Sequence, residues 1–334
     1  MSQTISVIPG DGIGPEIMQA TLRVLDALQC DLEYEFVEAG LAALEKGQDL
    51  IPQQTLDSIR RNRVLLKGPL TTPVGEGFSS INVTLRKEFD LYANVRPVIS
   101  MPGTLSHYEN IDIITVRENT QGAYLAADSR VSEDGETAES KMVVTRTGCD
   151  RITHYAFELA RREGRRKVTI VHKANILKTV SGMFLEVARK AAAKYPDIQT
   201  EEMIVDAACM RLVMDPWHFD VIVTTNLFGD IISDLCAGLV GGLGLAPGAN
   251  IGKDAAMFEA VHGSAPDIAG RHIANPCALM LGAAQMLSHL DMEKSARKLR
   301  SAIRETLAAG DRVTPDVGGQ GSTQSMTDAI IERL

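Results

Sequence analysis

The sequence predicts an α/β protein built on an open sheet. Short β-rich runs alternate with helix-like segments along the chain, and no repeat or low-complexity tract interrupts them. The length of 334 residues is long for one hydrophobic core and indicates two domains or one large α/β domain. Hydrophobic residues make up 45% of the chain and charged residues 23%, which is typical of a soluble globular protein.

The first β-loop-α unit is expected at the N-terminus. The apolar run 4–9 predicts a strand, and apolar positions recur at helical spacing over 17–28, with Pro15 suited to a first helical turn. The connecting loop has glycines in a G-x-G-x-G spacing over 10–14. This spacing, with no acidic residue closing a second strand about 20 residues further on, does not match the Rossmann fingerprint.

The later elements follow the same alternation. A stretch rich in glycine and proline at 238–252 is typical of a hinge or crossover. Apolar residues at helical spacing predict helices, and short β-branched runs predict strands. The expected strands lie within 111–120, 165–173, 200–208 and 219–226, an apolar segment covers 257–263, and the expected helices lie at 151–162, 176–195, 277–290 and 293–309.

A hairpin is predicted near residues 127–145. Asp134-Gly135 lies between Val131 and the β-branched run 142–145, and an Asp-Gly pair favours a tight hairpin turn. Because such a hairpin would project from an α/β domain, we expect it to serve subunit assembly.

The charge and cysteine content limit the partners and the compartment. A net charge of −9 argues against nucleic acid or an acidic membrane surface as a partner. No apolar run reaches the ~18 residues of a membrane span, and the N-terminus has no basic and apolar signal pattern, so a cytoplasmic location is expected. The five cysteines form no C-x-x-C pair, which favours reduced thiols and no zinc site.

The segment 67–96 is the most informative about function. A glycine-rich turn in it is surrounded by side chains that can hold a small polycarboxylate, because an arginine fork binds a carboxylate through two parallel hydrogen bonds. The alternative is a polar loop followed by a solvated amphipathic helix. Since the whole chain is acidic, an anionic ligand needs a local basic cluster. The polar groups are Thr71, Thr72, Ser79, Ser80 and Asn82, and the candidate cations are Arg86, Lys87, Arg96 and Arg117.

Three aspartates are candidate metal ligands. Asp230 and Asp234 lie four residues apart after the strand run 219–226, so they share one face of the expected helix. Two converging carboxylates favour a cation between them, although an aspartate at a helix start also serves as a cap. Asp206 would supply a third oxygen ligand. Hard oxygen ligands without Cys or His nearby suit Mg²⁺ or Mn²⁺.

Two further segments carry candidate chemistry. Lys173 ends a predicted strand, and it is either a surface cation or, if partly buried beside Asp206, a lysine able to pass protons. The polar turn 262–275 offers backbone amides of the kind that bind a pyrophosphate or adenosine group.

These motifs together resemble the isocitrate/isopropylmalate dehydrogenase family of β-decarboxylating dehydrogenases over essentially the whole chain. The resemblance is carried by 67–96, RENTQGAY, VHKAN, NLFGDIISD and HGSAPDIAGRHIAN. It implies an α/β fold distinct from the Rossmann fold, with a mixed sheet shared by two domains. The large, discontinuous domain would comprise 1–98 and 248–334, and the small domain 99–247 with the hairpin. It also implies a homodimer with shared active sites, in which Lys173 and Asp206 reach the partner's cleft.

The resemblance also implies a reaction, the metal-dependent oxidative decarboxylation of isocitrate to 2-oxoglutarate and CO₂ with hydride transfer to NAD. Family members that act on 3-isopropylmalate have apolar side chains where this chain has Ser80 and Asn82. Homoisocitrate or 3-isopropylmalate as the substrate is one alternative. A non-catalytic regulatory subunit is another, and it is disfavoured because the acid, base and metal residues are all present.

Residue roles follow from the same resemblance. NAD is expected over NADP because Asp267, Ile268, Pro315 and Gly319 replace the Lys, Tyr, Tyr and Arg of NADP-using relatives. Gln121 stands where the family usually has an acid. The implied catalytic residues are Tyr124, Lys173 and Asp206; the substrate contacts are Ser80, Asn82, Arg86, Arg96, Arg117, Tyr124 and Lys173; the metal ligands are Asp206, Asp230 and Asp234; and the cofactor contacts are Leu70, Thr71, Thr72, Asn226, His262, Gly263, Ser264, Ala265, Pro266, Asp267, Ile268 and Asn275.

Overall fold

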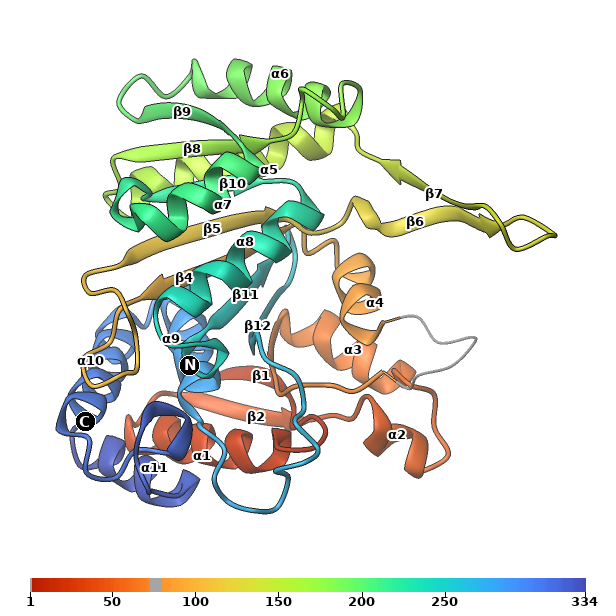
Figure 1. Ribbon diagram of the computed structural model, residues 1–334. Coiled ribbons are helices and arrows are strands. Elements are labelled where there is room, and N and C mark those ends of the chain that lie inside the picture. Colours follow the sequence, from red (N-terminus) through yellow and green to blue (C-terminus); the bar gives the residue numbers. More distant parts are fainter. Residues whose placement is uncertain (1, 73–79) are drawn as a thin grey trace.

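The computed structural model describes residues 2–72 and 80–334, with the backbone alone at 125–128. Within these residues a mixed sheet of ten strands runs through the molecule in the order β2-β1-β3-β12-β11-β4-β5-β10-β8-β9 (Figure 1). Its strands are β1 (Gln3–Ile8), β2 (Leu32–Phe36), β3 (Val64–Lys67), β4 (Ala93–Ile99), β5 (Asp112–Glu118), β8 (Lys167–His172), β9 (Gln199–Ile204), β10 (Val221–Thr224), β11 (Pro247–Ile251) and β12 (Ala256–Ala260).

Helices pack against both faces of this sheet. Those of the described ranges are α1 (Gly14–Ala27), α2 (Leu41–Glu45), α3 (Gln53–Asn62), α4 (Ile81–Glu88), α5 (Arg146–Arg162), α6 (Val180–Ala192), α7 (Val205–Met214), α8 (Asn226–Leu239), α9 (Cys277–His289), α10 (Glu293–Ala309) and α11 (Thr323–Ile331). In these ranges no helix combines the length and the apolar character needed to cross a membrane.

The strand directions confirm the predicted mixed α/β sheet. The pairs β12–β11, β11–β4 and β4–β5 are antiparallel, and the other neighbours in the sheet are parallel. The strands from the predicted large domain lie on one side of the β4–β5 pair and those from the predicted small domain on the other. The sheet is continuous across this pair, and the division into two domains stays a prediction.

Most of the predicted elements are confirmed. The run 4–9 forms β1, and α1 follows it with Pro15 in its first turn. The expected strands within 111–120, 165–173, 200–208 and 219–226 form β5, β8, β9 and β10. The stretch 238–252 is more than a crossover, because its C-terminal third forms β11 in the middle of the sheet.

The predicted hairpin is confirmed as β6 (Gly122–Val131) and β7 (Ala138–Val143), which project from the body of the molecule (Figure 1). The amide of Ser132 donates to the carbonyl of Thr137 at 2.8 Å and closes the tip. Gly135 has φ +74°, a left-handed conformation that glycine adopts without a steric penalty.

The hydrophobic core is arranged differently on the two faces of the sheet. On one face a continuous core joins β-strand residues such as Val95 and Val116 to α1, α5, α6, α9 and α10. On the opposite face two separate cores form, one around α7 and α8 that includes Val98 and Ile232, and one around α3 and α4 that includes Leu65 and Leu85. Because strand side chains alternate between faces, polar residues between these two cores point into the gap that separates them.

Candidate active site

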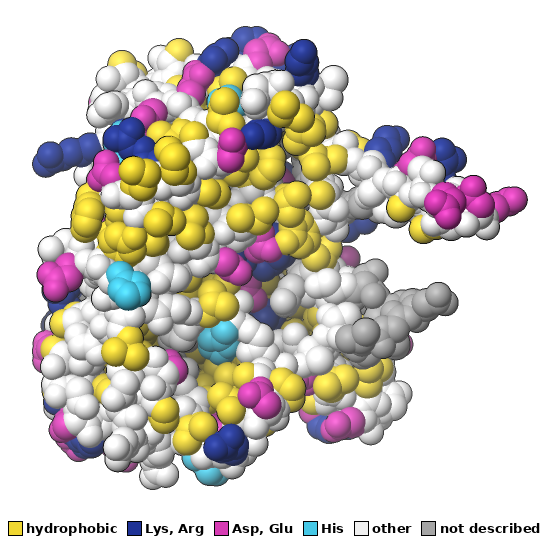
Figure 2. Space-filling model, in the orientation of Figure 1, with side chains coloured by type: hydrophobic (Ala, Val, Ile, Leu, Met, Phe, Trp, Pro, Cys, Tyr) yellow, Lys and Arg dark blue, Asp and Glu magenta, His cyan; other side chains and the backbone are white. Residues whose placement is uncertain are grey.

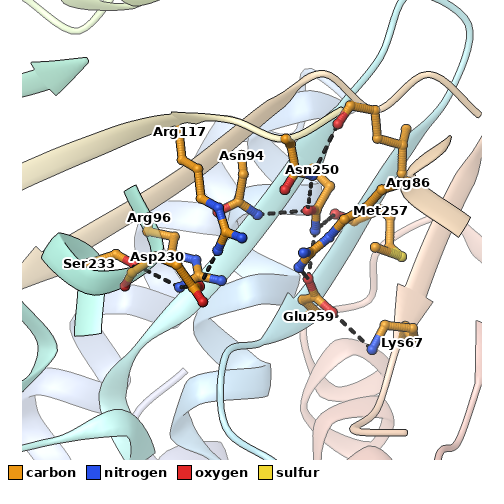
Figure 3. Close-up of polar contacts among 12 residues, drawn as sticks. Lys67, Arg86, Asn94, Arg96, Arg117, Asp230, Ser233, Asn250, Met257 and Glu259 are labelled. Atoms are coloured by element: carbon orange, nitrogen blue, oxygen red, sulfur yellow. Dashed lines mark hydrogen bonds and ion pairs between the residues drawn. The ribbon is translucent and has the colours of Figure 1, made fainter. Parts of the chain in front are cut away.

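A row of polar side chains crosses five adjacent strands in this gap. The strand register places Lys67 beside Glu259, Asn250 beside Asn94, and Asn94 beside Arg117. Figure 3 shows these side chains directed into one region, and Figure 2 shows acidic and basic groups gathered in a hollow between the two halves of the molecule. Strands from two separate stretches of the chain, 64–118 and 247–260, therefore contribute to one polar site.

Three buried arginines form the cationic part of the site. Arg86 comes from α4, Arg96 from β4 and Arg117 from β5, and each is less than 10% exposed. Burial and the charges of Arg96 and Arg86 lower the pKa of Arg117 to about 10. Burial and the charge of Arg86 also lower the pKa of Arg96. The three positive charges repel one another. A bound anion would offset this repulsion, so the cluster favours anion binding.

Several donors and acceptors of the site have no hydrogen-bond partner within the described residues. They include the Nε atoms of Arg86 and Arg96 and the Oδ1 atoms of Asn82 and Asn94, all buried. A buried polar atom without a partner is costly, and a ligand that pairs with it recovers that cost. Three of the predicted substrate residues thus offer unused polar atoms in or next to the arginine cluster.

Asp230 links the arginine cluster to Tyr124, one of the predicted catalytic residues. Its carboxylate accepts from Arg117 Nη1, from the Tyr124 hydroxyl and, at 3.3 Å, from Arg96 Nη1. Burial opposes ionisation of Asp230, but the charge of Arg117, the Tyr124 hydrogen bond and the charge of Arg96 lower the pKa of this carboxyl. Burial and the hydrogen bond to Asp230 raise the pKa of Tyr124. The phenol is therefore protonated at neutral pH, and its hydrogen is directed at Asp230.

Asp230 and Asp234 converge as expected, but not at a helix start. α8 begins at Asn226 with Thr225 as its N-cap, so the capping alternative is wrong for both aspartates. Both accept from Arg96 Nη1 at 3.3 Å, and this nitrogen also donates to Ser233 Oγ at 2.6 Å. Burial raises the pKa of Asp234, so a cation beside it would favour the ionised form.

Lys173 and Asp206 lie apart from these aspartates. Lys173 follows β8, Asp206 lies in the first turn of α7, and the two form an ion pair on the surface with Asp206 69% exposed. The hydrogen bond from Lys173 lowers the pKa of Asp206. Among the described residues of one chain, no three His, Cys, Asp or Glu side chains come together as a metal site. The predicted set of three aspartates is thus not assembled within a single chain.

A buried network around Glu259 was missed by the sequence reasoning. Its carboxylate accepts from Lys67 Nζ at 2.9 Å, from Arg86 Nη2 at 3.2 Å and from Asn250 Nδ2 at 2.7 Å. Burial would raise the pKa of Glu259, but the charges of Lys67 and Arg86 overcome it and lower the pKa to about 2. Glu259 therefore holds Arg86 in place. The sequence feature that could have pointed to Glu259 is a charged residue inside the apolar strand run 256–260.

The N-terminal glycine loop brings two predicted cofactor segments together. The Asp11 amide donates to the Pro69 carbonyl at 2.7 Å, and the Asp11 carboxylate accepts from the Thr71 amide at 2.8 Å. A Cβ atom at Gly12 would collide with the carbonyl of Ser264. The hydroxyls of Thr71 and Ser264 lie 2.6 Å apart. The glycines thus serve the close approach of backbones instead of a Rossmann turn.

Other predicted cofactor residues are used partly within the protein. Asn275 donates to Asp316 at 2.9 Å and accepts from the Cys277 amide at 2.9 Å, and Asn226 contacts Arg117. Burial lowers the pKa of His262, which therefore is neutral at pH 7. Three of the predicted cofactor residues are exposed to solvent: Gly263, Pro266 and Asp267. Three others are partly buried: Leu70, Ala265 and Ile268. Thr72 Oγ1 accepts a hydrogen bond from the Ile81 amide at 3.3 Å.

Two sequence expectations concern the edges of the site. Ser79 and the glycine-rich turn at 75–77 lie outside the described residues, whereas Ser80 is exposed immediately before α4. Gln121 clamps the hairpin base to α5, because its side chain accepts from the Thr145 amide at 2.7 Å and donates to the Thr145 hydroxyl at 2.8 Å. Gln121 thus has a structural role where the resembled family usually has an acid.

The fold and the site define an α/β protein with a cluster of buried arginines beside paired carboxylates and a phenol, an arrangement suited to a small polyanion. The chain belongs to the isocitrate/isopropylmalate dehydrogenase family, which its sequence matches over residues 4–330. It is therefore a dehydrogenase of this family, which confirms the resemblance seen in the motifs.

Individual relatives share nearly the whole chain. It is 48% identical to the catalytic subunit 5 of mitochondrial NAD isocitrate dehydrogenase from Arabidopsis thaliana over 332 residues, covering 99% of this chain and 88% of that protein. It is 47% identical to 3-isopropylmalate dehydrogenase from Archaeoglobus fulgidus over 330 residues, covering 99% of both. The crystal structure of isocitrate dehydrogenase from Methylococcus capsulatus matches with a TM-score of 0.95 and 54% identity, covering 100% of this chain and 99% of that chain. Identity alone does not separate the two substrates.

Proposed function

We propose that the protein catalyses the metal-dependent oxidative decarboxylation of isocitrate to 2-oxoglutarate and CO₂, with NAD as the hydride acceptor. The supporting observation is the buried arginine cluster, in which Arg86 and Arg96 have unpaired Nε donors, because such donors suit a ligand with several carboxylates. The test is a kinetic panel of purified protein with isocitrate, homoisocitrate and 3-isopropylmalate, each with NAD and NADP. Isocitrate with NAD should be the best pair, and no turnover with any acid would support a non-catalytic subunit instead.

The chain's own residues provide binding and proton transfer for this reaction. Arg86, Arg96 and Arg117 would hold the carboxylates, and the protonated Tyr124 hydroxyl beside Asp230 would donate a proton to the carbon that loses CO₂. The Lys173–Asp206 pair would remove the hydroxyl proton of the substrate. When bound, NAD takes the hydride and the divalent ion polarises the oxygen of the new carbonyl group.

The divalent ion is proposed to bind Asp230 and Asp234 of one chain. Two carboxylates on one face of α8 fit an ion that prefers oxygen ligands, Mg²⁺ or Mn²⁺. We expect Asp230→Asn and Asp234→Asn to lower the affinity for the ion, because each removes one negative oxygen ligand, and Asp230 to matter more because it also holds Arg117 and Tyr124. Calorimetric Mg²⁺ titration with isocitrate present measures this. Normal affinity in either variant would contradict that residue's role.

A homodimer is proposed to complete the site. Asp206 and Lys173 lie on the surface, away from Asp230. The adjoining faces of α7 and α8 expose large apolar side chains that a second copy would cover (Figure 2). These side chains are Met210, Val213, Met214 and Ile231.

Subunit mixing tests the shared site. Lys173→Ala and Tyr124→Phe homodimers should each be nearly inactive, and mixing them with subunit exchange should restore part of the activity. Recovery is expected because hybrids contain one site with both wild-type residues. Exchange is verified by mass spectrometry of the hybrids, and mixing two preparations of Lys173→Ala is the control. Full exchange without recovered activity would refute the shared site.

A preference for NAD over NADP is proposed from the loop that carries Asp267. The side chain of Asp267 is exposed and makes no hydrogen bond within the described residues, so capping of the turn is not supported. A carboxylate there accepts from a ribose hydroxyl but repels a 2′-phosphate. We expect kcat/KM for NAD to exceed that for NADP by on the order of 10²-fold. The double variant Asp267→Lys/Ile268→Tyr should lower this ratio sharply, and an unchanged ratio would count against the argument.

A further inference from the structure

Asn226 makes contacts that do not suit a cofactor ligand. It is the first residue of α8 and is 2% exposed. Its Oδ1 atom accepts from Arg117 Nε at 3.0 Å and from Arg117 Nη2 at 2.7 Å, while its Nδ2 atom donates to the carbonyl of Gln121 at 2.9 Å. An arginine only donates and a carbonyl only accepts, so these partners fix the orientation of the amide. Both ends of the Asn226 side chain therefore contact other parts of the protein, and one N–H of Nδ2 remains.

The same arginine is fixed on its other sides. A Cβ atom at Gly229 would lie 2.6 Å from the Cβ and Cγ atoms of Arg117, so α8 lies directly on the arginine stem. The guanidinium lies 4.9 Å from the centre of the Tyr124 ring, and Nη1 donates to Asp230. These contacts use three of the five N–H donors of Arg117. One N–H remains on each terminal nitrogen, enough for a carboxylate to accept from both.

We propose that Asn226 is a positioning residue that orients Arg117 toward a substrate carboxylate, with the Gln121 carbonyl as its anchor. This inference rests on the proposed function, in which Arg117 binds the substrate, and it replaces the cofactor contact expected from the sequence. A neutral acceptor suits this task. It orients the guanidinium without neutralising its charge, whereas an aspartate would compete with the substrate and repel the Gln121 carbonyl.

The test separates substrate binding from cofactor binding. Asn226→Ala and Asn226→Asp should each raise KM for isocitrate about 10-fold or more, since an oriented charge-assisted contact is lost or neutralised. The dissociation constant of NAD, measured by calorimetry without substrate, should stay within about 2-fold of wild type. A weakened NAD affinity with an unchanged KM for isocitrate would overturn the proposal. Asn226→Asp is nearly isosteric and keeps the test valid if the alanine variant does not fold.

A double-mutant cycle shows whether Asn226 acts through Arg117. In an Arg117→Lys background, where no Nε–Nη2 fork exists, the effect of Asn226→Ala on KM should shrink to about 2-fold. Asp267→Asn, on a separate loop, is the comparison and should show the same effect in both backgrounds. Equal effects of Asn226→Ala in both backgrounds would refute the positioning role. If homoisocitrate or 3-isopropylmalate is the true substrate, the same variants are tested on the KM for that acid. A wrong substrate assignment is therefore distinguished from a wrong role of Asn226.

Discussion

Isocitrate is expected to exceed 3-isopropylmalate in kcat/KM by about 10⁴-fold. The buried Oδ1 atom of Asn82 and the buried Nε atoms of Arg86 and Arg96 have no partner within the described residues. A third carboxylate supplies acceptors for the arginines and, through rotation of the Asn82 amide, for its Nδ2 group. The alkyl group of 3-isopropylmalate would leave such groups desolvated and unpaired, and this penalty is larger than the gain from a hydrophobic contact.

A variant of α4 extends this prediction. Ser80→Leu/Asn82→Leu should lower the isocitrate to 3-isopropylmalate ratio by at least 10²-fold, because it removes the polar contacts and adds apolar surface for the alkyl group. Lys87→Leu is the control, since Lys87 is exposed on the same helix and adds an identical side chain away from the site. Similar kcat/KM values of the wild-type protein for both acids would refute the isocitrate assignment. If the double replacement leaves the ratio unchanged, the start of α4 does not determine the discrimination between the two acids.

Glu259→Leu is expected to destabilise the fold by roughly 3–5 kcal/mol. Lys67 is 1% exposed, and Glu259 holds it at 2.9 Å, so removing the carboxylate leaves a buried ammonium without a counter-charge. Urea denaturation measures the loss. Adding Lys67→Met should recover part of it, because the buried ammonium is then absent while Arg86 still lacks its carboxylate partner. Glu332→Leu, which removes an exposed partner of Arg312, is the control and should change the stability far less, because an exposed ion pair is screened by solvent.

The same pair predicts a pH dependence. The pKa of Glu259 is about 2 in the folded protein against an ordinary value of 4.5, so its charge stabilises the fold fully above pH 4.5. This contribution, on the order of a few kcal/mol, is lost as the pH falls toward 2. The stability difference between wild type and Glu259→Gln should therefore be largest near neutral pH and shrink on acidification. A difference that does not depend on pH would contradict the assigned ionisation of Glu259.

Local patterns were enough to predict an open α/β sheet and several candidate site residues. Strand runs such as 219–226 and the helix spacing after Pro15 depend on side-chain periodicity, which a sequence displays directly. Arg86, Arg96 and Asp230 were singled out because arginine forks and paired carboxylates suit charged ligands, and the resemblance to the family weighed against a solvated helix or a helix cap. The same reasoning misplaced the role of the stretch 238–252, since glycine and proline also occur in a short central strand.

Only the tertiary structure decided which of these residues meet. The strand order brings β3, β12, β11, β4 and β5 side by side from distant parts of the chain, and this order cannot be read from any one segment. The tertiary structure paired Lys67 with Glu259 and Asn226 with Arg117, and it did not bring Asp206 into one metal-binding group with Asp230. Sequence periodicity fixes which face of a strand a side chain takes. Long-range packing chooses the neighbour, because contact energies depend on burial and on partners that are remote in sequence.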